Sequence, residues 1–337
     1  MSEQLTEPKV ESAAGTRPLL EVRNLVKHFP IKGGLLQLPV AWVKAVDGVS
    51  FEINKGETLG LVGESGSGKS TVARTILRLI PPTSGEVLLD GQSVFKASAD
   101  EMKKLRRDLQ IIFQDPYGSL NPRMSVGEII GEGLVVHGVG SPKQREAAVN
   151  RLLEVVGLRG QHRGRFPHEF SGGQRQRIGI ARSLTLEPEL LVADEPVSAL
   201  DVSIQSQILL LLQRLQQRHK LAFIFISHDL GVVRYFCQSM AVMYLGRIVE
   251  TGTIPAIFKE PLHPYTRMLR DASPVPDPKV KVVMLRIEGE VPSAVNPPAG
   301  CHFHTRCPHV MPICRNVYPE WRQIDSERGV ACHLHTR

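Results

Sequence analysis

The segment that most constrains the fold of this chain is GESGSGKS, residues 63–70. It matches the pattern G-x-x-x-x-G-K-[ST], follows the strand-like TLGLV and opens the helix-like STVARTILRLI. In this context backbone N–H groups surround phosphate oxygens, and the helix start adds partial positive charge. We therefore predict a phosphate-binding loop in which Lys69 reaches the β- and γ-phosphates of a nucleotide and Ser70 ligates Mg²⁺. The alternative is a glycine turn without a ligand, which the strand–loop–helix context disfavours.

A second polar group follows the apolar segment ELLVADEP (189–196), which reads as a buried strand ending at a proline. The strand would deliver Asp194 and Glu195 to the carboxyl edge of the sheet, where ligands of α/β proteins bind. We expect Asp194 to hold Mg²⁺ and Glu195 to polarise an attacking water. Two acids at a strand end can also serve only as a helix cap. The glycine loop favours the phosphoryl-transfer interpretation.

Buried apolar strands alternate with helical segments along most of the chain. LAFIFISHD (221–229) reads as a strand, 201–220 as a helix, and 101–190 as mostly helical, whereas 31–42 resembles a loop excursion. This alternation predicts an α/β fold with a mostly parallel sheet and helices on its faces. After about residue 255 prolines become frequent and helical periodicity weakens, which predicts a smaller and looser C-terminal unit.

Composition and the N-terminal sequence limit the class of protein and its compartment. The chain has 337 residues, a formal net charge of +7 and no apolar run near the ~20 residues that a membrane-spanning helix requires. The N-terminal residues lack the pattern of a secretory signal, so we expect a cytoplasmic protein. The positive charge fits a basic solvated surface, or else attraction to nucleic acid or an anionic membrane.

Four of the five cysteines lie near the C-terminus. The spacings between Cys301, Cys307, Cys314 and Cys332 are C-x5-C, C-x6-C and C-x17-C, which differ from the close pairs of common zinc modules. Disulfides are rare in a reducing compartment, so a metal site is favoured, and free thiols or disulfides are the alternative. A mixed site with zinc is chemically possible, because histidines lie among the cysteines, namely His302, His304, His309, His333 and His335. Cys237 is expected to be a small buried hydrophobe.

A series of short motifs resembles those of ATP-binding-cassette ATPases. FSGGQRQR (170–177) stands between the glycine loop and the acidic strand, and VKHFP, IIFQDP, SALD and ISHD appear in the family's order. The resemblance implies that Gln114 bridges Mg²⁺ and the attacking water, and that His228 contacts the γ-phosphate. It places Asp201 in the D-loop and Phe29 on the adenine, with Trp42 as an alternative. The residues expected around ATP are Gly63, Glu64, Ser65, Gly66, Ser67, Gly68, Lys69, Ser70, Thr71 and Phe29.

The residues before the helix in FSGGQRQR form a second phosphate-binding helix start. They are Ser171, Gly172, Gly173 and Gln174. The resemblance implies that they face the nucleotide of an opposite subunit, so that two cassettes close head-to-tail around two ATP molecules. A lone copy of the chain should therefore hydrolyse ATP poorly.

Other segments resemble the ATPase subunits of dipeptide and oligopeptide importers, in particular the F-type subunit. They are FQDPYGSLNPRMSVGEII (113–130), HPYT (263–266), EGEVPSAVNPPAGCHF and RCP. The resemblance implies a P-loop ATPase domain over 18–255, with a helical subdomain at about 115–188, and a C-terminal extension over 256–337. Residues 1–17 are expected to be a disordered tail.

The resemblance also implies the function. Hydrolysis of ATP with Mg²⁺ would energise import of di- and oligopeptides, with a second ATPase subunit, two integral-membrane permease subunits and an extracytoplasmic peptide-binding protein as partners. The chain would lie peripherally on the cytoplasmic face of the membrane and bind no nucleic acid. Import of nickel chelates, glutathione or other small solutes, export, and a nucleic-acid-associated ATPase are the alternatives.

Two further expectations concern particular segments. The resemblance implies a four-iron, four-sulfur cluster on Cys301, Cys307, Cys314 and Cys332, with zinc as the alternative metal. Residues 114–130 are expected to dock on a membrane subunit through Tyr117, Leu120 and Met124, unless they form a packed internal loop.

Overall fold

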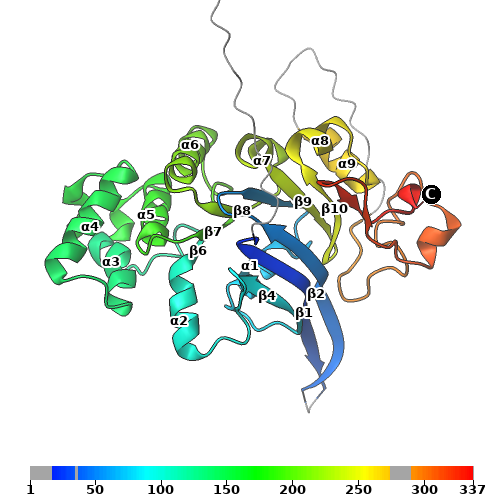
Figure 1. Ribbon diagram of the computed structural model, residues 1–337, viewed down its shortest axis with the longest axis horizontal. Coiled ribbons are helices and arrows are strands. Elements are labelled where there is room, and N and C mark those ends of the chain that lie inside the picture. Colours follow the sequence, from blue (N-terminus) through cyan, green and yellow to red (C-terminus); the bar gives the residue numbers. More distant parts are fainter. Residues whose placement is uncertain (1–16, 35–36, 274–289, 337) are drawn as a thin grey trace, which may run out of the picture.

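A computed structural model of the protein describes residues 17–34, 37–273 and 290–336 (Figure 1). Its larger sheet has the strand order β11-β12-β10-β9-β3-β8-β7-β6. The five strands β9, β3, β8, β7 and β6 run parallel to one another, and β10 is antiparallel to β9. The strands of this sheet are β3 (Thr58–Val62), β6 (Leu109–Ile112), β7 (Leu190–Asp194), β8 (Ala222–Ser227), β9 (Ser239–Tyr244), β10 (Arg247–Thr253), β11 (Arg322–Gln323) and β12 (Gly329–Val330).

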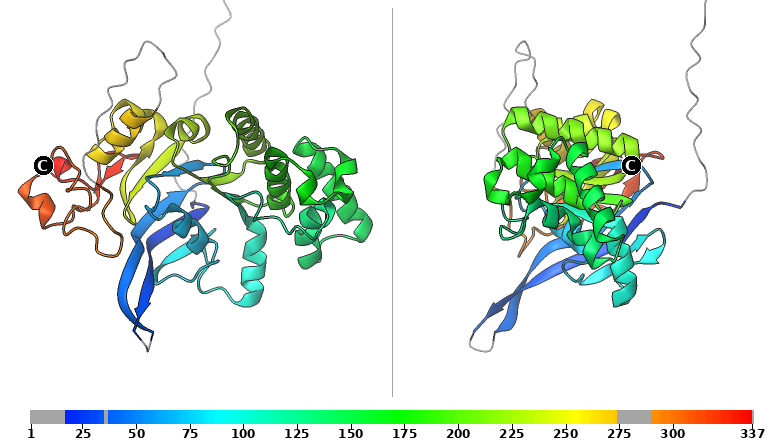
Figure 2. Two further views of the ribbon diagram at one scale, coloured as in Figure 1. Left: turned by 180° about the vertical axis from the view of Figure 1, so that it is seen from behind. Right: turned by 90° about the vertical axis from the view of Figure 1, so that its left-hand side faces the viewer.

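A smaller antiparallel sheet packs beside the first. Its strand order is β2-β1-β4-β5, and its strands are β1 (Leu20–Gly33), β2 (Leu38–Ile53), β4 (Ser84–Leu89) and β5 (Gln92–Ser93). The prediction of a loop over 31–42 is wrong, because Ile31 pairs with Ala41 and Lys32 with Pro39. The hairpin of β1 and β2 projects from the body of the molecule (Figure 2), so its outer part gains backbone hydrogen bonds rather than burial. That outer part lacks a buried face, which is why it resembled a loop.

The described part of the chain has nine α-helices. Serine begins four of the longer ones, since Ser98, Ser125, Ser141 and Ser171 each form a capping box with the residue three positions later. The predicted helix at 201–220 is confirmed, and the mostly helical stretch 101–190 also contains the short strand β6. The helices are α1 (Lys69–Ile76), α2 (Ala99–Asp108), α3 (Val126–Val136), α4 (Pro142–Val155), α5 (Gly172–Leu184), α6 (Val202–His219), α7 (Leu230–Phe236), α8 (Ile254–Lys259) and α9 (Pro264–Ala272).

Two apolar cores lie on the two faces of the larger sheet. Alternate side chains of β8 supply both, with Phe223 and Phe225 in one cluster and Ile224 and Ile226 in the other. Every residue of β3, β7 and β8 is buried, as expected for parallel strands covered on both faces. The sheet is therefore a rigid platform whose carboxyl edge carries the predicted site.

The C-terminal extension adds to this platform at the end opposite α3, α4 and α5 (Figure 1). Its strand β12 pairs with β10, where Glu250 lies opposite Val330. Phe303 is 1% exposed and belongs to the apolar cluster that contains Phe223 and Phe225 of β8. The proposed bounds 18–255 and 256–337 stay a prediction, and the expected N-terminal tail lies outside the described residues except for Arg17.

Candidate nucleotide-binding site

The phosphate-binding loop connects β3 to α1, and two of its glycines are sterically required. Gly63 and Gly68 have φ angles of 151° and 104°. A Cβ atom on Gly63 would lie 2.2 Å from the carbonyl oxygen of Met243, and one on Gly68 would lie 2.0 Å from that of Ala45. No other residue fits these positions without moving the backbone of β9 or β2. Close packing is therefore a reason for the glycine pattern in addition to the predicted phosphate binding.

Lys69 begins α1 and is 4% exposed. Its ammonium donates hydrogen bonds to the carbonyl oxygens of Gly63 at 2.8 Å and Glu64 at 2.9 Å. Burial lowers the pKa of Lys69, and the nearby carboxylates, of which Glu195 has the strongest effect, oppose this shift. The lysine is thus a buried cation inside the loop, the arrangement expected for binding phosphate oxygens.

Ser70 and Asp194, the two residues predicted to ligate Mg²⁺, contact each other. The Ser70 hydroxyl donates to Asp194 Oδ1 at 2.8 Å, although the two residues are 124 positions apart in the sequence. Asp194 is 2% exposed, and burial raises the pKa of its carboxyl group, while the Ser70 hydrogen bond and the charge of Arg74 act in the opposite direction. A hydroxyl and a carboxylate in contact are hard oxygen donors, so this set fits Mg²⁺.

Glu195, Gln114 and His228 meet at the carboxyl ends of three adjacent strands. Gln114 Nε2 donates to Glu195 Oε2 at 2.9 Å, and His228 Nδ1 lies 3.4 Å from the same oxygen. Glu195 has a φ of 46°, which is unusual for a residue other than glycine, and its N–H is held by the Ile226 carbonyl oxygen at 3.1 Å. Strained backbone of this kind is typical of functional positions. The structure therefore brings together three residues that are separated by up to 114 positions.

The residues of FSGGQRQR lie elsewhere in the fold. Ser171 caps α5, where its hydroxyl accepts a hydrogen bond from the Gln174 N–H at 3.4 Å, and Gly172 and Gly173 begin the helix. Helix α5 packs on α3, α4 and α6 in the helical group at one end of the molecule, whereas α1 lies near the centre (Figure 1). A role opposite the nucleotide of another subunit, and the D-loop role of Asp201 at the start of α6, stay predictions.

The proposed adenine contact also stays a prediction. Phe29 lies in β1, is half-buried and has the Lys27 ammonium 4.8 Å from its ring centroid. Trp42 is 47% exposed on the projecting hairpin, where it pairs with Pro30.

The expected docking segment has one exposed aromatic residue. Tyr117 is 62% exposed, and the Arg175 guanidinium lies over its ring at 4.0 Å. Leu120 is 2% exposed and Met124 packs against the core, so the prediction that both are available to a partner is wrong for Leu120. The segment is a packed loop that leads into the start of α3 and has an exposed tip at Tyr117, while Leu120 lies in the same apolar cluster as Val126.

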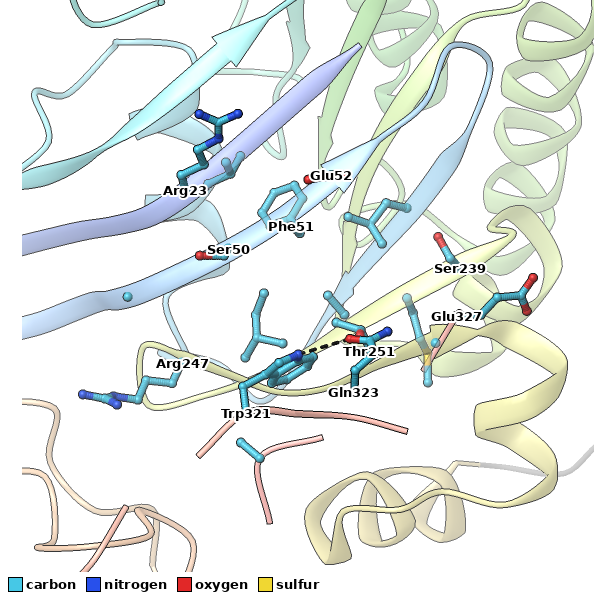
Figure 3. Close-up of a pocket in the computed structure, with 18 of the residues that line it drawn as sticks. Arg23, Ser50, Phe51, Glu52, Ser239, Arg247, Thr251, Trp321, Gln323 and Glu327 are labelled. Carbon is cyan, nitrogen blue, oxygen red and sulfur yellow. Dashed lines mark hydrogen bonds between the residues drawn. The ribbon is translucent and has the colours of Figure 1, made fainter. Parts of the chain in front are cut away.

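A cavity of about 1160 Å³ lies away from this site, between the two sheets and the extension (Figure 3). Phe51 of β2, Thr251 of β10 and Trp321 of the extension line it, and the Trp321 indole N–H donates to Gln323 Oε1 at 3.4 Å. None of the residues expected to bind ATP lines this cavity. No sequence pattern pointed to it, because its walls come from segments up to about 300 residues apart.

The four C-terminal cysteines line one small pocket, together with His263, His304, His309 and His333. None of the five cysteines forms a disulfide, and Cys237 is buried in the core as predicted. Burial raises the pKa of the Cys301 thiol to about 12 and that of Cys332 to about 11. Over residues 17–34, 37–273 and 290–336, no group of three or more Cys, His, Asp or Glu residues has the arrangement of a metal site. The donor chemistry thus fits a thiolate-bound metal, while the described side chains are not closed around one.

Two residues of the extension contact the phosphate-binding loop. Arg306 forms an ion pair with Glu64, and the Tyr265 hydroxyl accepts a hydrogen bond from the Glu64 N–H. They are 242 and 201 positions from Glu64, so no spacing could reveal them. Tyr265 does belong to the HPYT motif, which is the one sequence signal for this contact.

Comparisons with known proteins agree with this fold. Residues 46–198 match the model for ABC transporters, and residues 249–314 match that for the oligopeptide/dipeptide transporter C-terminal region. The chain is 50% identical over 328 residues to the oligopeptide transport ATP-binding protein AppF of Bacillus subtilis, covering 96% of this chain and all of the relative. It is 51% identical over 321 residues to the putative oligopeptide transport ATP-binding protein YkfD of the same organism, covering 94% and 96%.

A solved structure extends the comparison to the fold. The ATP-binding cassette MJ0796, described as a dimer in a post-hydrolysis state bound to ADP and phosphate, superposes with a TM-score of 0.62 and 28% sequence identity. The alignment covers 70% of this chain and 98% of that one. The protein is thus an ATPase with the ATP-binding-cassette fold. Within that class, the chain belongs to the ATP-binding proteins of the oligopeptide/dipeptide transporter family. In the described part of the chain no helix is both long and apolar enough to cross a membrane.

Proposed function

We propose that this chain is the ATP-hydrolysing subunit that energises import of di- and oligopeptides through a membrane transporter. The observation that carries the proposal is the direct contact between a complete phosphate-binding loop and an extension of the oligopeptide/dipeptide transporter type. The names of the similar proteins, which describe oligopeptide transport, support the choice of cargo. Nickel chelates, glutathione and other small solutes are the competing cargoes.

The geometry supports a particular role for each residue in ATP binding and hydrolysis. Lys69 would bind the β- and γ-phosphates, and Ser70, Asp194 and Gln114 would hold Mg²⁺, which neutralises charge on the phosphate oxygens. Glu195 would accept a proton from the attacking water, because its carboxylate is oriented by Gln114 and lies beside His228. His228 would then contact the γ-phosphate from the end of β8.

The assembly proposed here has three kinds of partner. A second, homologous ATPase would supply the opposite FSGGQRQR-type helix start, and two integral-membrane permease subunits would receive the closing motion. An extracytoplasmic peptide-binding protein would deliver the cargo. The chain would lie on the cytoplasmic face of the membrane, with the exposed tip at Tyr117 available to a permease.

The test is to purify the full-length chain from native membranes together with the proteins that bind it. We expect a second ATPase and two multi-spanning subunits to co-purify, and the complex in vesicles to take up a labelled tripeptide only with ATP. A Lys69→Ala variant of this chain should assemble but not transport. Uptake of a nickel chelate or glutathione in preference to the peptide would contradict the cargo, and co-purification with nucleic acid would contradict the transport role.

We also propose that Cys301, Cys307, Cys314 and Cys332 hold a four-iron, four-sulfur cluster. Four unpaired thiols line one pocket, and a bound metal would lower the pKa values that burial raises. The ring nitrogens of three of the histidines already contact backbone carbonyl oxygens: His304 that of Cys301, His333 that of Val317 and His335 that of Leu262. A metal-bound histidine commonly donates its other ring N–H to such a carbonyl, so a mixed zinc site remains the alternative.

Anaerobically purified protein should contain about four irons per chain and absorb in the blue part of the visible spectrum. Cys307→Ser should lose most of the iron, whereas Cys237→Ser should keep it, because Cys237 lies in the core away from the pocket. Zinc in place of iron would support the alternative metal, and a metal-free protein would contradict both.

A further inference from the structure

Glu64, the second residue of the phosphate-binding loop, is held by the C-terminal extension. Arg306 Nη1 donates to Glu64 Oε2 at 2.8 Å, and Arg306 Nη2 donates to Oε1 at 2.9 Å. The Tyr265 hydroxyl accepts a hydrogen bond from the Glu64 N–H at 2.8 Å. The carbonyl oxygen of Glu64 accepts from Lys69. Side chain, N–H and carbonyl of one loop residue are therefore all fixed, two of them by the extension.

Arg306 is itself firmly supported. Its side chain is 4% exposed, and its Nη1 also lies 3.4 Å from the Tyr244 hydroxyl. The rings of Tyr244, Tyr265 and Phe303 pack on one another with centroid distances of 4.7–5.4 Å, and Phe303 lies three residues before Arg306. A planar guanidinium that meets both oxygens of a carboxylate is stronger and more directional than a single charge contact.

The HPYT motif orients the second contact. The Glu250 carboxylate of β10, 0% exposed, accepts the N–H groups of Leu262 at 2.9 Å and His263 at 2.8 Å. His263 Nδ1 in turn accepts the Tyr265 N–H at 3.0 Å at the start of α9. This chain of hydrogen bonds fixes the direction of Tyr265, whose hydroxyl then reaches the phosphate-binding loop.

Glu64 places a negative charge in the loop that must bind polyphosphate. An unpaired carboxylate there would repel ATP, and a guanidinium with two hydrogen bonds offsets that charge. We propose that Arg306 and Tyr265 are positioning residues of the ATP site, so that the extension sets the loop geometry and the affinity for ATP. This proposal rests on the ATP site proposed above.

Calorimetric titration of the full-length chain with ATP and Mg²⁺ tests the proposal. Arg306→Gln should raise the Kd for ATP about tenfold, because it leaves the Glu64 carboxylate without its charged partner. Arg306→Lys should recover part of the affinity, and Tyr265→Phe should raise the Kd about threefold. Arg267→Gln, an exposed arginine on the same helix as Tyr265, is the matched control and should leave the Kd unchanged.

A double variant separates this role from general damage. Glu64→Gln combined with Arg306→Gln should bind ATP more tightly than Arg306→Gln alone, because no bare carboxylate remains. In the assembled transporter, Arg306→Gln should raise KM for ATP while kcat changes less than about twofold. Additive effects, or an unchanged Kd in folded Arg306→Gln, would contradict the proposal.

Two controls keep the outcome clear. Circular dichroism and thermal unfolding report whether Arg306→Gln folds, and if it does not, Tyr265→Phe decides, since it removes one hydrogen bond to Glu64 and keeps Arg306. Lys69→Ala tests the ATP site itself. If Lys69→Ala binds ATP as tightly as the unmodified chain, the proposed ATP site is wrong. If Lys69→Ala loses ATP binding while Arg306→Gln keeps the Kd of the unmodified chain, only the proposed role of the extension is wrong.

Discussion

Glu195→Gln is expected to lower ATP turnover of the assembled transporter on the order of 10²–10⁴-fold while leaving ATP binding intact. The amide has the shape of the carboxylate but does not accept the proton of the attacking water. Gln114 donates to Glu195 at 2.9 Å, so the site would keep its geometry. The measurement is phosphate release, together with gel filtration of the variant in ATP, where we expect a trapped closed pair of ATPase subunits.

A matched control and a binding measurement make this result specific. Glu154→Gln, on the exposed side of α4, makes the same chemical change far from the loop and should leave turnover unchanged. Normal turnover in Glu195→Gln would remove Glu195 from the proposed mechanism. Loss of ATP binding together with turnover would instead show that the carboxylate maintains the site, for example through its attraction to Lys69.

The core of this fold follows from local pattern. The glycine loop, the apolar segments of β7 and β8 and the helix at 201–220 each carry their own signal within about 20 residues. The pair Ser70–Asp194 was also predictable, because the strand before Asp194 and the strand before the glycine loop end at one edge of a parallel sheet. The alternation of strands and helices was enough to predict that these two residues, far apart in the sequence, lie close together. Gln114 was assigned to the site only through the family resemblance, because strand β6 before it was not predicted.

Contacts of the extension were not predictable in this way. Arg306 stands in an irregular, proline-rich segment, so neither period 2 nor period 3.6 indicates where its side chain points. Strand β12 has two residues and pairs with β10 only because the chain returns across the sheet. The prediction of a loop over 31–42 was wrong for a different reason. The outer part of the β1–β2 hairpin is held by backbone hydrogen bonds, and no side-chain pattern indicates these.

The second large effect is expected at the start of α5. Gly172→Asp should lower turnover of the assembled transporter on the order of a hundredfold, because a carboxylate would face the phosphates that this helix start is proposed to bind on the partner. A Cβ atom at Gly172 would lie 3.6 Å from Leu200 Cδ2, an ordinary contact, so the change is electrostatic and not steric. Turnover is measured in the complex, and ATP affinity on the chain alone.

Two comparisons show whether Gly172 acts on the opposite subunit. Gly172→Ala adds the same Cβ without charge and should keep most of the turnover, whereas Gly173→Ala would place a Cβ 2.5 Å from Ile204 Cγ2 and tests crowding instead. Because α5 lies in the helical group, away from α1, Gly172→Asp should leave the Kd for ATP of the isolated chain unchanged. A weakened Kd in the isolated chain would mean that the helix acts on its own loop, and the head-to-tail arrangement would then be wrong.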